Sequence, residues 1–127
     1  MTQEDKELLL KDLCARLPYG VMIQHPELFC PSRMVVEKLE GIDREHINDD
    51  GIYIEHVKPY LRPMFSMTEE EIKELSKIDE KRLIFSARHL TFHLDGEVID
   101  YLSRKMFDYR GLIKRGLAIE APEGMYN

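Results

Sequence analysis

The start of the chain has leucines at intervals of three and four residues, a spacing typical of an amphipathic helix. Thr2 and Asp5 have the spacing of a capping box, in which each side chain accepts a hydrogen bond from the other residue's backbone N–H. Pro18 biases the residue before it away from helical geometry. We therefore predict a helix over residues 3–16. Its polar, solvent-facing side should carry Lys6, Lys11, Asp12 and Arg16.

Three later stretches have the apolar or alternating pattern typical of β-strands. In the third, the alternation places Ile52 and Ile54 on one face, together with His56 if the strand extends that far. A strong turn signal over residues 48–51 precedes it. We expect an antiparallel meander with the first helix against one face. The three stretches are residues 21–23, 33–39 and 52–57.

Two prolines, Pro59 and Pro63, follow the third stretch. Proline has no backbone N–H to donate to a neighbouring strand, so we expect the sheet to end before them. Residues 58–63 are therefore predicted to form an extended strip that crosses the domain outside the sheet.

A second helix has the clearest local signal in the chain. Thr68 and Glu71 again have the spacing of a capping box, and three consecutive carboxylates fall in the first turn, where the helix dipole favours them. Met67 and Ile72 have the spacing of a hydrophobic staple across the same helix start. We predict a surface helix over residues 69–79.

The signals in the C-terminal part of the chain are weaker. Residues 83–94 alternate in part, which favours one or two strands, although a helix stays an alternative. A third helix should start at Asp95 or Gly96 and carry apolar residues as far as Met106.

The remaining elements complete an α+β pattern. Residues 110–115 predict a short fourth helix with Gly116 just after its end, and residues 117–120 predict a last short strand. With 127 residues, of which 43% are hydrophobic and 33% charged, the chain can form one core and is not disordered throughout. We expect residues 1–127 to form a single compact α+β domain: a small antiparallel sheet (a meander) with an N-terminal helix and two or three further helices packed on it.

The charge balance narrows the choice of partners. Eighteen Lys and Arg against 24 Asp and Glu give a formal net charge of −6, which disfavours nucleic acid because phosphate binding needs a basic excess. Within residues 81–115 the balance reverses to eight basic and four acidic residues, so a small anionic partner stays open there. No window approaches the roughly 18 consecutive apolar residues of a membrane span, and the start of the chain does not resemble a secretory signal. We therefore expect a cytoplasmic protein without a membrane partner.

Few residues have the pattern of a catalytic or cofactor site. Cys14 should be a buried thiol on the first helix and Cys30 should lie in a loop, with no disulfide expected in the cytosol. The chain has no glycine-rich phosphate loop and no serine-nucleophile motif. We expect no cofactor and favour a protein without catalytic activity, with a Cys30 nucleophile beside His25 or His56 as an alternative.

The histidines and cysteines also lack the spacing of a metal site. His89 and His93 would share a metal only if they lay on a helix, and we expect a strand there. A mixed site would lack the short ligand spacings that structural zinc sites use. Its ligands would have to be Cys14, Cys30, His25 and His46.

Two groups of side chains are candidate binding surfaces. The first is basic, with the aromatic residues Tyr101, Phe107 and Tyr109 interleaved, a mix that binds anions or single-stranded nucleic acid, although we favour a solvated helix face. The second is apolar and bounded by prolines, and it packs either within the domain's own core, which we favour, or against a protein partner. The basic group is Arg104, Lys105, Tyr109, Arg110, Lys114 and Arg115, and the apolar group is Tyr60, Leu61, Met64, Phe65 and Met67.

Two stretches have a distinctive sequence: residues 57–71 read VKPYLRPMFSMTEEE and residues 107–127 read FDYRGLIKRGLAIEAPEGMYN. Together they resemble a family of short proteins without an assigned activity, found in gut-dwelling bacteria and their phages or mobile elements. This chain departs from that family at Phe65, where serine is usual, and at Lys105 and Met106, where a histidine pair is common. The resemblance implies an accessory, phage-associated role and assigns no functional residue.

These observations predict a non-enzymatic cytoplasmic accessory protein that acts through protein–protein contact. One alternative is single-stranded nucleic-acid binding through the basic and aromatic C-terminal region. The other is a hydrolase or transferase that uses Cys30 or a histidine. The pattern leaves the oligomeric state open.

Overall fold

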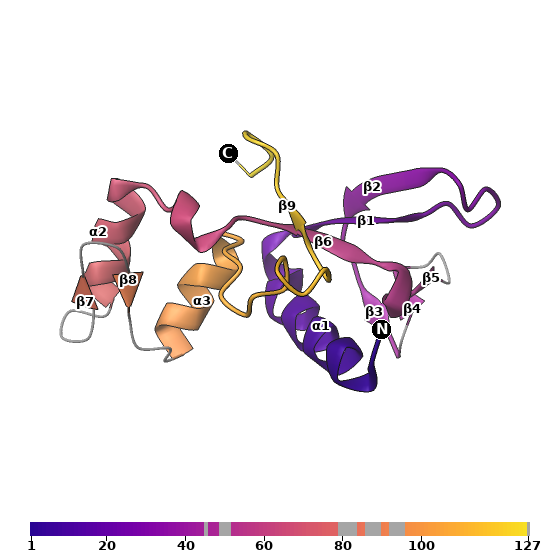
Figure 1. Ribbon diagram of the computed structural model, residues 1–127, viewed down its shortest axis with the longest axis horizontal. Coiled ribbons are helices and arrows are strands. Elements are labelled where there is room, and N and C mark those ends of the chain that lie inside the picture. The colour runs from indigo at the N-terminus through magenta and orange to yellow at the C-terminus, as the bar shows by residue number, and fades with distance from the viewer. Residues whose placement is uncertain (45, 49–51, 79–83, 86–89, 92–95, 127) are drawn as a thin grey trace.

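The computed structural model of the chain describes residues 1–44, 46–48, 52–78, 84–85, 90–91 and 96–126 (Figure 1). Within these ranges the chain forms three α-helices together with short β-strands, which confirms the predicted α+β class. They are α1 (Gln3–Arg16), α2 (Glu69–Ile78) and α3 (Gly96–Arg104). Short 3₁₀ helices follow α1 and interrupt the strands at Leu17–Tyr19, Ile54–His56 and Met64–Ser66.

Both predicted capping boxes are present, and both helices start where the sequence places them. At α1 the backbone N–H of Asp5 donates to the Thr2 hydroxyl at 3.0 Å, and the N–H of Thr2 donates to the Asp5 carboxylate at 3.5 Å. At α2 the N–H of Glu71 donates to the Thr68 hydroxyl at 3.2 Å, and the N–H of Thr68 donates to the Glu71 carboxylate at 3.1 Å. These local bonds satisfy helix N–H groups that otherwise have no partner within the helix.

The main sheet has four strands in the order β2-β1-β6-β9. Two small sheets accompany it, with the orders β3-β4-β5 and β7-β8. All described strand pairs are antiparallel except β6 with β9, so the last strand joins the meander in a parallel pairing that was not predicted. The strands are β1 (Met22–Pro26), β2 (Met34–Lys38), β3 (Ile42–Asp43), β4 (His46–Ile47), β5 (Ile52–Tyr53), β6 (Lys58–Leu61), β7 (Ile84–Phe85), β8 (Leu90–Thr91) and β9 (Ile119–Glu120).

The expectation that the sheet ends before Pro59 is wrong, because β6 lies between β1 and β9. Pro59 is opposite Ile23, and Ile23 directs its backbone groups towards β2 on its other side. The missing N–H of Pro59 therefore faces away from β1. On that side β9 pairs only from Tyr60 onwards, so no ladder hydrogen bond is lost.

The predicted strand over residues 52–57 is too long. It ends at Tyr53, and a 3₁₀ turn follows. Residues three apart lie on one side of a 3₁₀ turn, so Ile54 and Val57 are both buried while His56 is exposed. The alternation of Ile52 and Ile54 imitates a longer strand because both side chains reach the core.

The predicted fourth helix is also wrong, and residues 110–115 form turns. Gly111 has a φ of +74°, a left-handed conformation that interrupts a right-handed helix. The Asp108 carboxylate accepts hydrogen bonds from the backbone N–H groups of Leu112 and Ile113 at 2.8 and 3.0 Å, which holds the turns in place. The last predicted strand is confirmed as β9, and the strands expected within residues 83–94 are confirmed as β7 and β8.

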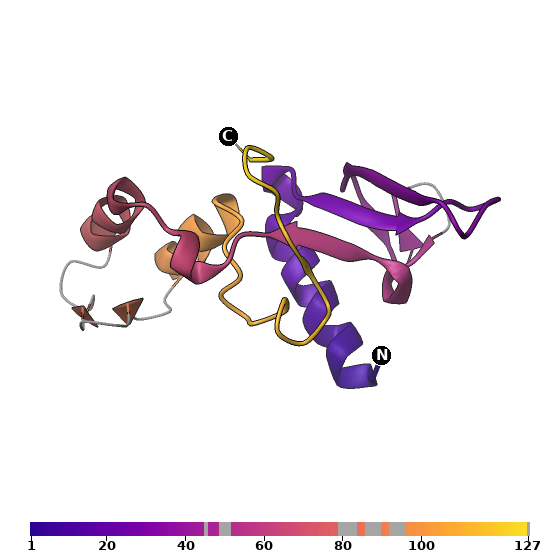
Figure 2. The same cartoon turned by 45° about the horizontal axis from the view of Figure 1, so that its top comes forward.

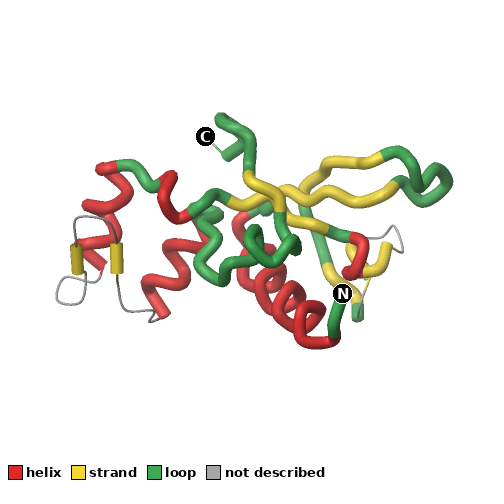
Figure 3. The backbone as a smooth tube through the Cα atoms, viewed as in Figure 1, coloured by secondary structure: helices red, strands yellow, loops and turns green. Residues whose placement is uncertain are grey.

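The buried side chains form two clusters. In the larger cluster, α1 covers one face of the main sheet (Figure 2). The smaller cluster lies between α2 and α3. These two helices are at the opposite end of the molecule from the β1–β2 hairpin (Figure 3). Its fully enclosed members are Leu75, Val98, Tyr101, Leu102 and Phe107.

Helix α1 differs from its prediction in which side chains it buries. Asp12 and Arg16 were expected on the solvent face, yet both have no exposed surface. Cys14, expected in the core, is exposed. The reason is a long-range network: Arg16 bonds Asp12 at 2.8 and 3.0 Å and donates to the carbonyl of Phe107 at 2.7 Å. Helical spacing cannot reveal a partner that lies 91 residues further along the chain.

Candidate functional site

Four of the exposed large hydrophobic side chains of the described chain lie on the β1–β2 hairpin, which is more than on any other element. Its turn is closed by backbone hydrogen bonds from Glu27 N–H to the Arg33 carbonyl at 2.8 Å and from Arg33 N–H to the Cys30 carbonyl at 2.9 Å. These bonds fix the turn and leave Phe29 at its tip, where 91% of the side chain is exposed.

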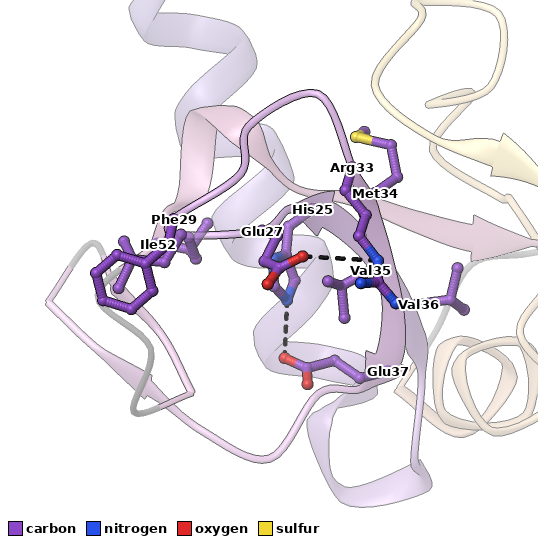
Figure 4. Close-up of a pocket in the computed structure, with 10 residues that line it drawn as sticks. His25, Glu27, Phe29, Arg33, Met34, Val35, Val36, Glu37 and Ile52 are labelled. Carbon is purple, nitrogen blue, oxygen red and sulfur yellow. Dashed lines mark hydrogen bonds and ion pairs between the residues drawn. The ribbon is translucent and has the colours of Figure 1, made fainter.

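A hollow of about 560 Å³ lies beside this hairpin, between the main sheet and β5 (Figure 4). The polar side chains of His25 and Glu37 line its floor. The residues that line it are His25, Glu27, Leu28, Phe29, Arg33, Met34, Val35, Val36, Glu37 and Ile52.

His25 forms the floor of the hollow and is 4% exposed. Its Nε2 lies 2.8 Å from the Glu37 carboxylate and its Nδ1 lies 2.8 Å from the Pro26 carbonyl. The carbonyl only accepts hydrogen bonds, so the Pro26 contact requires a proton on Nδ1. Glu37 also accepts from Asn48 at 3.0 Å. Both ring nitrogens of His25 are engaged within the β1–β2 hairpin, so His25 is not arranged as a base for a nucleophile, and Glu37 links the hairpin to Asn48 beside β4.

The hairpin is apolar and exposed beside this hollow. Four large hydrophobic side chains lie on it, Leu28 and Phe29 in the turn and Met34 and Val36 on the face of β2 opposite to Glu37, and we call them the apolar rim. Their exposed fractions range from 47% for Val36 to 91% for Phe29. Single exposed apolar residues are ordinary, but several on one hairpin mark an interaction site. The apolar rim consists of Leu28, Phe29, Met34 and Val36.

Strand β2 is one of the two outer strands of the main sheet. Its register with β1 shows which of its backbone groups face outward. The N–H of Leu39 donates to Val21 at 2.9 Å, so alternate residues of β2 bond to β1, namely Val35 and Glu37. The backbone groups of Met34 and Val36 therefore point away from β1. The order of the sheet places no described strand against them. We call these groups the open edge of β2.

The end of the molecule that carries the hairpin is strongly acidic. Residues 21–57 contain eight Asp and Glu against three Lys and Arg, so they account for most of the net charge of −6. At the hollow itself, Glu27 pairs with Arg33 at 3.6 Å, and the side chain of Glu37 is 33% exposed.

The predicted basic group is not assembled into one cationic patch. Arg110 donates to the buried Asp12 at 3.1 Å and to the Tyr109 hydroxyl at 3.1 Å. Arg115 donates to Asp5 at 3.3 Å. Arg104 lies over the ring of Tyr101, whereas Lys105 is half-buried and Lys114 is exposed. Much of this charge is therefore used inside the fold.

The predicted apolar strip is divided between core and surface. Tyr60 and Leu61 are buried, and Met64 and Met67 pack against the smaller cluster. Phe65 is 87% exposed and is the one large apolar group that this strip presents to solvent.

The sulfur and imidazole groups are dispersed over the described residues. Cys14 and Cys30 are free and exposed, and Cys30 lies 3.6 Å from the Ser32 hydroxyl. His46 stacks edge-on against Tyr53. Among the residues that the structure describes, no three His, Cys, Asp or Glu residues are grouped as metal ligands. His89 and His93 lie outside the described residues.

Arg62 organises the smaller cluster at the other end of the molecule. It makes two hydrogen bonds of 2.7 Å to Glu71 and lies over the ring of Phe107 at 4.2 Å. The hydrogen bonds from Arg62 lower the pKa of Glu71 from 4.5 to about 2. Burial, followed by the hydrogen bond to Glu74, raises the pKa of Tyr101. These shifts come from an ion pair and a buried hydroxyl that hold α2 and α3 together.

No family model, no curated protein and no solved structure matches the chain. Among the described residues, no helix is long and apolar enough to cross a membrane. The apolar rim was not predicted from the sequence. The signal that could have found it is the pair Leu28-Phe29 in a turn, followed by Met34 and Val36 on one face of an outer strand.

Proposed function

We propose that the chain is a non-enzymatic accessory protein that binds another protein through the apolar rim. The phage-associated setting and the cytoplasmic location implied by the sequence belong to this proposal. The surface differs from the one expected in the sequence, because the strip from Tyr60 to Met67 is largely used for packing within the chain.

The observation that carries the proposal is the exposure of Phe29 at 91% beside a hollow of about 560 Å³. Complete burial of a large apolar side chain contributes about 1.5–3 kcal/mol, so four such groups supply a substantial driving force for binding. Aromatic and methionine side chains are enriched at the centres of protein interfaces.

Photo-cross-linking from the hairpin tests the proposal. A benzophenone amino acid replaces Phe29, and in a matched control it replaces Phe65, which is 87% exposed in η3 (Met64–Ser66), remote from the hairpin. Both proteins are expressed in the native host, and the cross-linked species are identified by mass spectrometry. We expect one defined protein to cross-link from position 29 and not from position 65. The same set of proteins at both positions, or none at position 29, contradicts the proposal.

A further inference from the structure

The open edge of β2 offers hydrogen bonds of a particular kind. Met34 and Val36 each direct one N–H and one C=O away from β1, the arrangement to which an added strand binds. The edge has a defined end, because the side chain of Asn48 donates to the carbonyl of Lys38 at 3.2 Å. An added strand can therefore pair over residues 34–37.

The two faces of β2 differ in chemistry. Figure 4 shows Met34 and Val36 on one side of the strand and Val35 and Glu37 on the other side, towards His25. Side chains of an added strand alternate between the same two faces. Apolar side chains would lie beside Met34 and Val36. Basic side chains would lie above the hollow, where Glu37 is 33% exposed.

The negative charge of residues 21–57, which surround the open edge, also favours an added strand with basic residues. Residues 21–57 hold eight acidic and three basic residues, so a basic strand is attracted and a second copy of this acidic end is repelled. The charged residues of β2, Glu37 and Lys38, are at its C-terminal end, so the stretch from Met34 to Val36 carries no charged residue or proline of the kind that protects an outer strand from pairing.

We infer that the open edge of β2 binds an extended segment of a partner protein in which apolar and basic residues alternate, by adding it as a fifth strand beyond β2. This inference rests on the proposed function and specifies its partner. The added strand places its apolar residues beside Met34 and Val36 of the apolar rim and its basic residues above Glu37. Main-chain hydrogen bonds supply the affinity, and the alternation supplies the specificity.

The probe is a synthetic peptide of alternating valine and lysine, added to the full chain labelled with ¹⁵N. Two matched peptides are methylated on alternate backbone nitrogens, one on the edge that would face β2 and one on the opposite edge. A third control has glutamate in place of lysine. Amide hydrogen exchange is followed residue by residue.

We expect the valine–lysine peptide to slow exchange at Met34 and Val36 by at least about tenfold, with Val35 and Glu37 little changed because they already bond to β1. One methylated peptide should lose this effect and the other should keep it. The glutamate peptide should bind at least about fivefold more weakly at low salt, and this difference should shrink at high salt.

Three results would overturn the inference. The first is no binding of the valine–lysine peptide at millimolar concentration. The second is methyl-group shifts at Met34 and Val36 without amide protection, which means side-chain docking and leaves the proposed function standing. The third is protection of the same amides by raising the protein concentration alone, which means that a second copy occupies the edge. Failure of the proposed function is recognised separately, by the loss of a defined cross-link from position 29.

Discussion

The charged side chain of Arg16 is fully buried, whereas the apolar side chain of Phe29 is 91% exposed. The regions around these two residues differ in the same respect: one buries charged groups and the other exposes apolar groups. Around Arg16, a region that we call the charged junction, two guanidinium groups and one carboxylate are enclosed with tyrosine and backbone partners. At the apolar rim, large hydrophobic groups face water. The charged junction is formed by Asp12, Arg16, Tyr109, Arg110 and the carbonyl of Phe107.

This difference indicates that the charged junction stabilises the fold and that the apolar rim is available to a partner. In the charged junction almost every polar atom has a partner within the chain, Arg16 Nη1 being the buried side-chain atom without one among the described residues. Such a network specifies how α1 meets the C-terminal segment. At the apolar rim the side chains contribute little to the core, so their exposure is a cost that binding would relieve.

The largest loss of stability is expected for Asp12→Ala in the charged junction. This substitution leaves Arg16 and Arg110 without their shared carboxylate. Loss of one partner from a buried ion pair costs about 3–5 kcal/mol. Urea denaturation should show a loss of that size. The control is Lys11→Ala on the exposed side of the same helix, which should change stability little. A loss below about 1 kcal/mol for Asp12→Ala would contradict a structural role for the junction.

The second effect is a pH dependence at the Arg62–Glu71 pair. The folded pKa of Glu71 is about 2 and its ordinary value is 4.5, so its stabilising contribution is present above pH 4.5 and is lost as the pH falls towards 2. Allowing for the partial exposure of Arg62, we expect this contribution to be about 2 kcal/mol. Glu71→Gln should be less stable by that amount at pH 7, and the gap should narrow in acid.

The matched control for this titration is Glu70→Gln, an exposed neighbour in the same helix turn. Denaturation curves at several pH values compare the two variants. An equal pH dependence in the unchanged chain and in Glu71→Gln would show that the ion pair does not contribute to acid sensitivity.

A smaller effect is expected at the C-terminal segment, which hydrogen bonds to the sheet through Tyr126. Its hydroxyl donates to the Tyr60 carbonyl at 2.6 Å and accepts from the Met22 N–H at 2.9 Å. Tyr126→Phe should cost about 1 kcal/mol. Burial raises the pKa of Tyr126 to about 12, so the unchanged chain should lose stability as the pH rises from 10 to 12. An identical alkaline loss in Tyr126→Phe would contradict this assignment.

The smallest effect is expected at the apolar rim itself. Phe29→Ser should change the free energy of unfolding by no more than about 0.5 kcal/mol, because the side chain is 91% exposed. The measurement is again urea denaturation. A loss above about 1.5 kcal/mol would place Phe29 in the fold rather than at an interface.

The sequence predicted those elements whose signals are local. Thr2 and Thr68 mark the starts of α1 and α2 through hydrogen bonds that span three residues. The α+β class followed from the same kind of pattern. Residues 48–51 signalled a turn, but Asp49 to Gly51 lie outside the described residues and leave that signal untested.

The elements that were predicted wrongly depend on distant partners. Pro59 lies within β6 because Ile23 and Ile119 are in the right register, and neither is near it in sequence. Asp12 is buried because Arg110 reaches it across 98 residues. The candidate site was missed for a related reason: the exposure of Phe29 depends on a turn closed between Glu27 and Arg33, and the open edge depends on the sheet order.

The central claim is that the apolar rim exists for contact with another protein and not for stability. It is tested most directly by the yield of the cross-link from position 29 in a chain that also carries Met34→Ser and Val36→Ser. We expect this yield to fall at least about fivefold, because the binding surface has lost its apolar groups, while the free energy of unfolding stays within about 1 kcal/mol. An undiminished cross-link in this folded variant would contradict the account.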